Sequence, residues 1–136
     1  MKKYKDKNKS FFKINNENNI IIEIGCGENK KFNRSIGIDL IDSESVDIHG
    51  NIYDILIDIP DSSIDRIYSS HCFEHLEDIV ILMKEISRIL KKEGSLEVTV
   101  PHFSNPYFFS DPTHKTSFGL YTFSYFAKDN ILKRKV

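Results

Sequence analysis

A chain of 136 residues is long enough to bury one hydrophobic core and too short for two packed domains. Its composition, with 40% hydrophobic and 29% charged residues, is that of a globular protein, and no apolar run approaches the roughly twenty residues of a membrane span. A formal net charge of -1 provides no overall positive field, so neither nucleic acid nor a membrane surface is an expected partner.

The two cysteines, Cys26 and Cys72, lie far apart in the sequence. They cannot form the disulfide framework typical of small secreted domains, which favours a reducing compartment. We therefore predict a cytoplasmic protein.

The first ten residues are polar and basic. Their lysines are not accompanied by an apolar segment or by an Arg-rich amphipathic pattern, so they do not have the composition of a targeting signal. We predict that residues 1–10 form a disordered basic tail and that residues 11–136 form a single domain.

Short apolar segments then alternate with polar connections, which predicts strands buried in a parallel sheet. The predicted strands are residues 20–24, 35–39, 46–48, 64–69 and 95–100. The connection between the first two leaves room for at most one turn of helix. Residues 52–59 and the Pro-Asp-Ser-Ser that follows them are typical of a turn-rich connection.

An amphipathic helix is predicted over residues 74–92. Apolar residues recur there at helical spacing, at Ile79, Leu82, Met83, Ile86, Ile89 and Leu90. Gly94 follows a basic last turn and is expected to end the helix. Because strands alternate with crossovers, we expect a parallel, right-handed α/β sheet that binds its ligand beyond the carboxyl ends of the strands.

A glycine loop and a carboxylate follow the first two predicted strands. Glu23 precedes Gly25 and Gly27, and Asp39 stands at the end of the next strand. Glycine allows close approach of the backbone to a ligand, and a carboxylate at the neighbouring strand end can accept hydrogen bonds from a ribose diol.

This succession of motifs resembles the class I S-adenosylmethionine-dependent methyltransferases. The acidic residue and Gly-x-Gly of their first motif match Glu23, Gly25 and Gly27, and their ribose-binding acid matches Asp39. Their adenine-side acid falls at Asn51, where an amide replaces the carboxylate. Further matches are residues 61–76 to the fourth-strand motif, residues 85–94 to the following helix and turn, and residues 101–103 and 110–115 to an extension found in small members.

The resemblance implies a Rossmann-like, mostly parallel α/β sheet in the order 3-2-1-4-5, with an irregular aromatic C-terminal extension. S-adenosylmethionine is the implied cofactor. Glu23 would approach its methionine amino group, Gly25 and Gly27 would give the backbone room, and Asp39 would hold the ribose. Asn51 and His71 would flank the adenine.

The family continues into two final antiparallel strands, whereas this chain ends with residues 131–136. Without those strands the sheet has an exposed edge, which is a liability for a soluble protein. Two alternatives follow: the domain is truncated, or a second copy covers the edge in a homodimer.

The aromatic and polar segment over residues 102–126 is either a packed cover at one end of the sheet or a substrate lid. His114 and then His102 are the candidate general bases within it, since an imidazole can accept a proton near neutral pH. The predicted reaction is methyl transfer to a small-molecule acceptor. A catalytically inert cofactor-binding module is the alternative.

The sequence His71-Cys72-Phe73-Glu74-His75 also fits the H-x-x-E-H pattern of a class of zinc peptidases. That chemistry needs both histidines on one face of a helix. The two serines before His71 indicate a strand end, which would place His71 in a loop before the helix. We therefore rank the metallopeptidase below the methyltransferase and predict no metal ligands.

Overall fold

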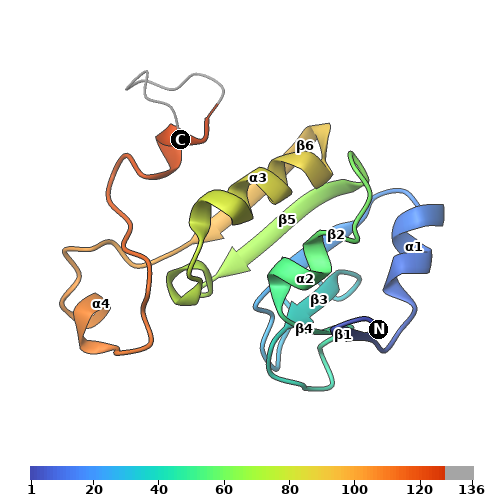
Figure 1. Ribbon diagram of the computed structural model, residues 1–136, viewed down its shortest axis with the longest axis horizontal. Coiled ribbons are helices and arrows are strands. Elements are labelled where there is room, and N and C mark those ends of the chain that lie inside the picture. Colours follow the sequence, from blue (N-terminus) through green and yellow to red (C-terminus); the bar gives the residue numbers. More distant parts are fainter. Residues whose placement is uncertain (128–136) are drawn as a thin grey trace.

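The computed structural model describes residues 1–127, and within them six strands form one sheet in the order β1-β4-β3-β2-β5-β6 (Figure 1). The strands are β1 (Tyr4–Asp6), β2 (Ile21–Ile24), β3 (Ile36–Asp39), β4 (Ile48–Gly50), β5 (Ile64–Ser70) and β6 (Leu90–Thr99). Strands β2 to β6 are parallel, and β1 pairs antiparallel with β4. Counted from β2, the parallel strands have the predicted order 3-2-1-4-5, so the predicted fold class is confirmed.

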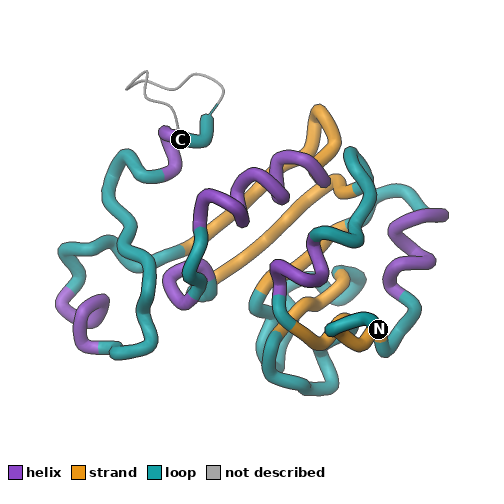
Figure 2. Tube along the Cα trace, viewed as in Figure 1, coloured by secondary structure: helices purple, strands orange, loops and turns teal. Residues whose placement is uncertain are grey.

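Short helices and loops connect the strands, as Figure 2 shows. The helices are α1 (Ser10–Asn16), α2 (Ile52–Leu56), α3 (Ile79–Ile89) and α4 (Pro106–Ser110), with two 3-10 turns, η1 (Phe73–His75) and η2 (Phe123–Tyr125). None of the helices in the described part of the chain has the length and hydropathy needed to cross a bilayer.

Isoleucines dominate the core. Ile22 in β2 and Ile67 in β5 pair across the centre of the sheet and have no exposed surface. Leu82 and Ile86 pack from α3 against the same core. β-branched side chains favour strands buried on both faces, which explains why these short runs predict the central strands well.

The first residues differ from the predicted disordered tail. Tyr4–Asp6 form the edge strand β1, paired with β4, and Asp6 accepts hydrogen bonds from the backbone N–H groups of Ser10 and Phe11 at 2.8 and 3.0 Å. These bonds satisfy free donors at the start of α1. A strand of three residues has no apolar run that could predict it from the sequence. It is recognised only by its pairing with β4.

The main helix is shorter than predicted at both ends. Asp78 caps α3 by accepting a hydrogen bond from the N–H of Ile81 at 2.9 Å, so the helix begins after the turn η1. Strand β6 begins immediately at Leu90, and an irregularity in its pairing with β5 accommodates Gly94 within the strand. Leu76 and Leu90 lie just outside the two ends of α3 and also pack against the core. The apolar spacing therefore continues past both ends of the helix.

The connections around the sheet show two further differences. Residues 25–35 are all described and contain no helix, so even the single predicted turn is missing. The predicted turn-rich connection includes the short helix α2. The expectation about the chain end, at residues 131–136, lies outside the described residues.

The segment after β6, which we call the C-terminal extension (residues 102–127), extends away from the end of the sheet in Figure 1. It is irregular apart from α4 and η2, as predicted. Phe108 and Phe118 are buried in it, whereas Tyr107 and Phe109 are exposed. It is fastened to η1 by the N–H groups of Lys115 and Thr116, which donate to the carbonyl oxygen of Glu74 at 2.7 and 3.1 Å.

Candidate functional site

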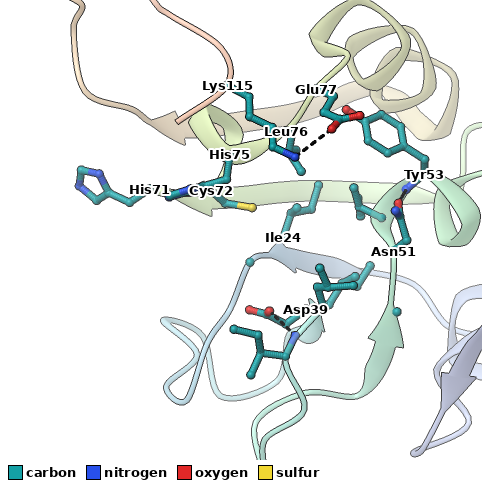
Figure 3. Close-up of a pocket in the computed structure, with 16 residues that line it drawn as sticks. Ile24, Asp39, Asn51, Tyr53, His71, Cys72, His75, Leu76, Glu77 and Lys115 are labelled. Atoms are coloured by element: carbon teal, nitrogen blue, oxygen red, sulfur yellow. Dashed lines mark hydrogen bonds and ion pairs between the residues drawn. The ribbon is translucent and has the colours of Figure 1, made fainter. Parts of the chain in front are cut away.

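A pocket of about 560 Å³ lies at the carboxyl ends of the parallel strands (Figure 3). Four of the residues predicted to bind the cofactor line it: Gly25, Asp39, Asn51 and His71. They come from the ends of β2, β3, β4 and β5. Parallel strands end at one edge of a sheet, which is why residues distant in the sequence meet there.

Both the backbone conformation and the lack of space for a side chain require glycine at position 25. Its φ is +70°, a left-handed conformation, and a Cβ atom there would lie 2.6 Å from both Cβ and Sγ of Cys72. Gly27 has φ +59°, but a Cβ at Gly27 would meet nothing within 4 Å. Gly25 therefore sets how closely the loop approaches β5, whereas Gly27 matters only for its conformation.

Asp39 organises the loop as well as lining the pocket. Its Oδ2 accepts a hydrogen bond from the N–H of Gly27 at 2.8 Å, and its Oδ1 accepts one from the N–H of Ile41 at 2.9 Å. A carboxylate oxygen has two lone pairs, so each oxygen can still accept a hydrogen bond from a ligand. The carboxylate is half-buried, at the mouth of the pocket.

Asn51 and His71 line the pocket in different ways. The Oδ1 of Asn51 accepts from the N–H of Tyr53 at 2.9 Å and so caps α2. His71 has φ 51° and donates its N–H to the carbonyl of Thr99 at 2.8 Å. Its side chain is 65% exposed and in Figure 3 points away from Asp39 and Asn51. His71 therefore contributes mainly backbone to the pocket.

Glu23 lies on the other side of the glycine loop. It lines a second pocket, of about 240 Å³, together with Gly25 and Cys26. Its buried carboxylate accepts hydrogen bonds from the N–H groups of Lys31 and Phe32, at 2.7 and 2.9 Å, and from the hydroxyl of Ser35. In this arrangement Glu23 holds the loop between β2 and β3, which contains no helix.

Sequence reasoning missed several residues of the larger pocket. Leu40 and Ile41, 68% and 77% exposed, follow Asp39 directly; two apolar residues after a strand-ending acid were the available signal. Lys115 and Glu77 also line the pocket and form an ion pair at 2.9 Å. No sequence signal places Lys115 there, because the C-terminal extension reaches the pocket only in three dimensions.

The predicted general bases lie elsewhere. Among the described residues that line the pocket, neither His102 nor His114 is present. His102 contacts the hydroxyl of Ser104 at 2.7 Å in an exposed loop. His114 is held against Phe108, with ring centroids 5.1 Å apart. The structure thus brings together four of the residues predicted to bind the cofactor and leaves the two predicted bases outside the pocket that those four line.

The two cysteines at the glycine loop are poor nucleophiles. Burial, and next the negative charge of Asp39, raises the pKa of Cys26 to about 12. The same two causes raise the pKa of Cys72 to about 12. Both thiols are therefore expected to stay protonated at neutral pH, which makes them weak nucleophiles.

A parallel sheet with a glycine loop after β2 and a carboxylate after β3 defines a Rossmann-like domain of the kind that binds nucleotide cofactors. A family model described as "Methyltransferase domain" matches residues 22–98, more than half of the chain. The chain belongs to this family, the class I S-adenosylmethionine-dependent methyltransferases.

One solved structure is similar in fold: a SAM-dependent methyltransferase from Archaeoglobus fulgidus, with a TM-score of 0.65 and 20% sequence identity. The match covers 79% of this chain and 58% of that one. No curated protein matches this sequence. At such low identity the likeness concerns the fold.

Proposed function

We propose that this chain binds S-adenosylmethionine in the larger pocket and transfers its methyl group to a small-molecule acceptor. The observation that carries the proposal is the convergence of Gly25, Asp39, Asn51 and His71 on one pocket. Its volume of about 560 Å³ is in the range of small-molecule and cofactor sites.

The contacts suggest how the cofactor would lie. The ribose hydroxyls would donate to the free lone pairs of Asp39, whose position the N–H groups of Gly27 and Ile41 fix. The adenine would contact Leu40 and Ile41 on one side, with Asn51 and the backbone of His71 nearby. The methionine end would cross Gly25 toward the second pocket, where Glu23 is placed.

Methyl transfer from a sulfonium is an in-line displacement, so most of the catalysis can come from holding the acceptor about 3 to 3.5 Å from the methyl carbon. The proposal therefore assigns no obligatory general base. For a hydroxyl acceptor, a base is needed, and His114 and His102 stay predictions for that role.

The remaining parts of the proposal concern the environment of the protein. Within residues 1–127, β6 pairs with β5 alone, which supports a homodimer that covers this edge. The free cysteines support a cytoplasmic location. The net charge of -1 supports the absence of a nucleic-acid partner.

Calorimetric titration of S-adenosylmethionine and S-adenosylhomocysteine into the full chain tests the cofactor site. We expect micromolar binding of both. Asp39→Ala should weaken it by about 1 to 3 kcal/mol, roughly ten-fold to a hundred-fold. Asp61→Ala, at a side chain that is 77% exposed and paired with Arg88, is the matched control and should bind normally. No binding by the folded protein, or equal binding by the Asp39 variant, would contradict the assignment.

A multiple-turnover assay with methyl-labelled cofactor and a cell extract then tests the reaction. Repeated transfer of label to a small molecule supports the methyltransferase. Cofactor binding without any transfer indicates the catalytically inert module instead.

A further inference from the structure

A cluster of metal-ligating side chains lies beside the larger pocket. A carboxylate oxygen of Glu74 and one ring nitrogen each of His75 and His114 lie within 4.8 Å of one another. Glu74 and His75 belong to η1, and His114 belongs to the C-terminal extension. We propose that these three side chains form a binding site for a divalent transition-metal ion of the Zn²⁺ type.

Glu74 gives the first independent reason. Its side chain is only 2% exposed, and its Oε2 has no hydrogen-bond partner among the described residues. Its Oε1 has His71 Nδ1 at 3.5 Å, which is too long for a good hydrogen bond. Burying a carboxylate without partners is strongly unfavourable. A bound cation would supply the missing contact.

The hydrogen bonds of the two histidines give the second reason. The hydroxyl of Thr113 donates to Asp111 Oδ1 at 2.6 Å, so its oxygen accepts from His75 Nδ1 at 3.0 Å. His114 Nδ1 donates to the carbonyl of Phe108 at 2.7 Å, because a carbonyl can only accept. Both rings thus carry a proton on Nδ1, so Nε2 is the nitrogen through which each neutral ring would bind a metal. Histidines that bind metals are usually oriented by such a partner on the other nitrogen.

Two histidines and one carboxylate form a ligand set that suits zinc and other first-row divalent ions. Zinc bonds of about 2.0–2.2 Å put neighbouring ligand atoms about 3.4 Å apart, so ligand atoms now up to 4.8 Å apart need to approach one another by at most about 1.4 Å on binding. Asp111 Oδ2 lies 3.4 Å from His114 Nε2 and is a candidate for a fourth ligand.

The site would fasten the C-terminal extension to the wall of the pocket. His75 and Lys115 both line that pocket, and the backbone of Lys115 and Thr116 already bonds to the carbonyl of Glu74. An ion at Glu74 would reinforce this attachment. This role is structural, and with Nδ1 of His114 bonded to Phe108 and Nε2 bound to the ion, only His102 would stay a predicted base. The site differs from the peptidase pattern because His114 takes the place of His71. It does not depend on S-adenosylmethionine binding.

Titration of ZnCl₂ into the metal-free full chain, followed by calorimetry, tests the site. We expect one ion per chain, with micromolar or tighter affinity. Glu74→Gln and His114→Gln should each weaken binding at least about ten-fold. His49→Ala removes a ring that bonds instead to the carbonyl of Leu40, and it should bind zinc normally. Bound Co²⁺ should give visible absorption bands that are lost in the Glu74 variant.

Thr113→Val provides a test that keeps all three ligands. It removes the hydroxyl that orients His75 and also bonds to Asp111 in the same exposed turn. The protein should therefore fold, as circular dichroism can check, and bind zinc about ten-fold more weakly. The proposal is overturned if the folded wild-type chain binds no zinc, or if these variants bind it as well as the wild type. It is also overturned if replacing Cys26 and Cys72 by serine abolishes binding, since the ion would then occupy a cysteine site.

Discussion

Gly25 and Gly27 stand two positions apart in one loop, yet the structure gives them different constraints. Both have a positive φ, but only Gly25 is packed, against Cys72. Gly27→Ala should cost about 1 kcal/mol of unfolding free energy, for the left-handed conformation alone. Gly25→Ala should cost at least about 2 kcal/mol more, because the new Cβ collides with a side chain that cannot move away freely.

Urea denaturation of the two variants and the wild type checks this difference. Gly27→Ala is the internal control for backbone strain in the same loop. Equal losses in the two variants would show that the close approach of Gly25 to Cys72 contributes nothing to stability.

At the scale of elements, Asp47 joins three segments of the chain. Its Oδ2 accepts from the N–H of Gly37 in β3 and from Lys30 Nζ, both at 2.8 Å, and its Oδ1 accepts from the side chain of Asn8 at 2.6 Å. Burial acts to raise the pKa of Asp47, but the hydrogen bonds from Lys30, Gly37 and Asn8 together lower it below its ordinary value. The charged carboxylate is therefore part of what fixes the loops beside β3.

This lowered pKa predicts a pH dependence of stability. The stabilisation is complete above the unfolded-state pKa of about 3.9 and is lost as the pH falls through the lower folded-state pKa. At pH 7, Asp47→Asn should reduce the unfolding free energy by about 3 kcal/mol, since Lys30 loses its partner. The difference in unfolding free energy between the variant and the wild type should become smaller below about pH 4.

Urea unfolding at pH 7, 4 and 3 measures that difference. Asp61→Asn, at an exposed carboxylate, controls for the loss of one negative charge. A difference that stays constant from pH 7 to pH 3 would rule out the ionised Asp47 as its source.

On the scale of the whole molecule, the protection of backbone amides from hydrogen exchange should decrease from the sheet to the C-terminal extension. Amide hydrogen exchange should be slowest in β2 and β5, whose residues Ile22 and Ile67 are fully buried, because these strands open only with the whole fold. Within the C-terminal extension, exchange should be slowest at Lys115 and Thr116, whose N–H groups bond to the carbonyl oxygen of Glu74 in η1.

Exchange followed by mass spectrometry, with peptides that separate residues 102–112 from residues 113–118, can detect this pattern. Protected amides in the second peptide should take up deuterium at least about ten-fold more slowly than those in the first. Equally fast exchange in both would show that the extension is not attached at η1.

The amino-acid sequence by itself determined the parallel strands, their order and the family. Runs such as Ile21–Ile24, stopped by a glycine, specify a buried strand through local sterics and burial alone. Asp39 and Gly25 could be placed at the larger pocket because parallel strands end at one edge of the sheet, whatever the loops between them do.

Only the tertiary structure decided which residues meet through space. Strand β1 forms because β4 offers free backbone groups, and a local pattern contains no information about such a partner. Asp78 caps the start of α3, so the helix begins at Ile79 and not at residue 74, where the pattern predicts its start. Lys115 reaches the pocket, and His114 reaches Glu74, through a long irregular segment without periodicity. Contacts between distant residues depend on the path of the loops, which local propensity and spacing do not encode.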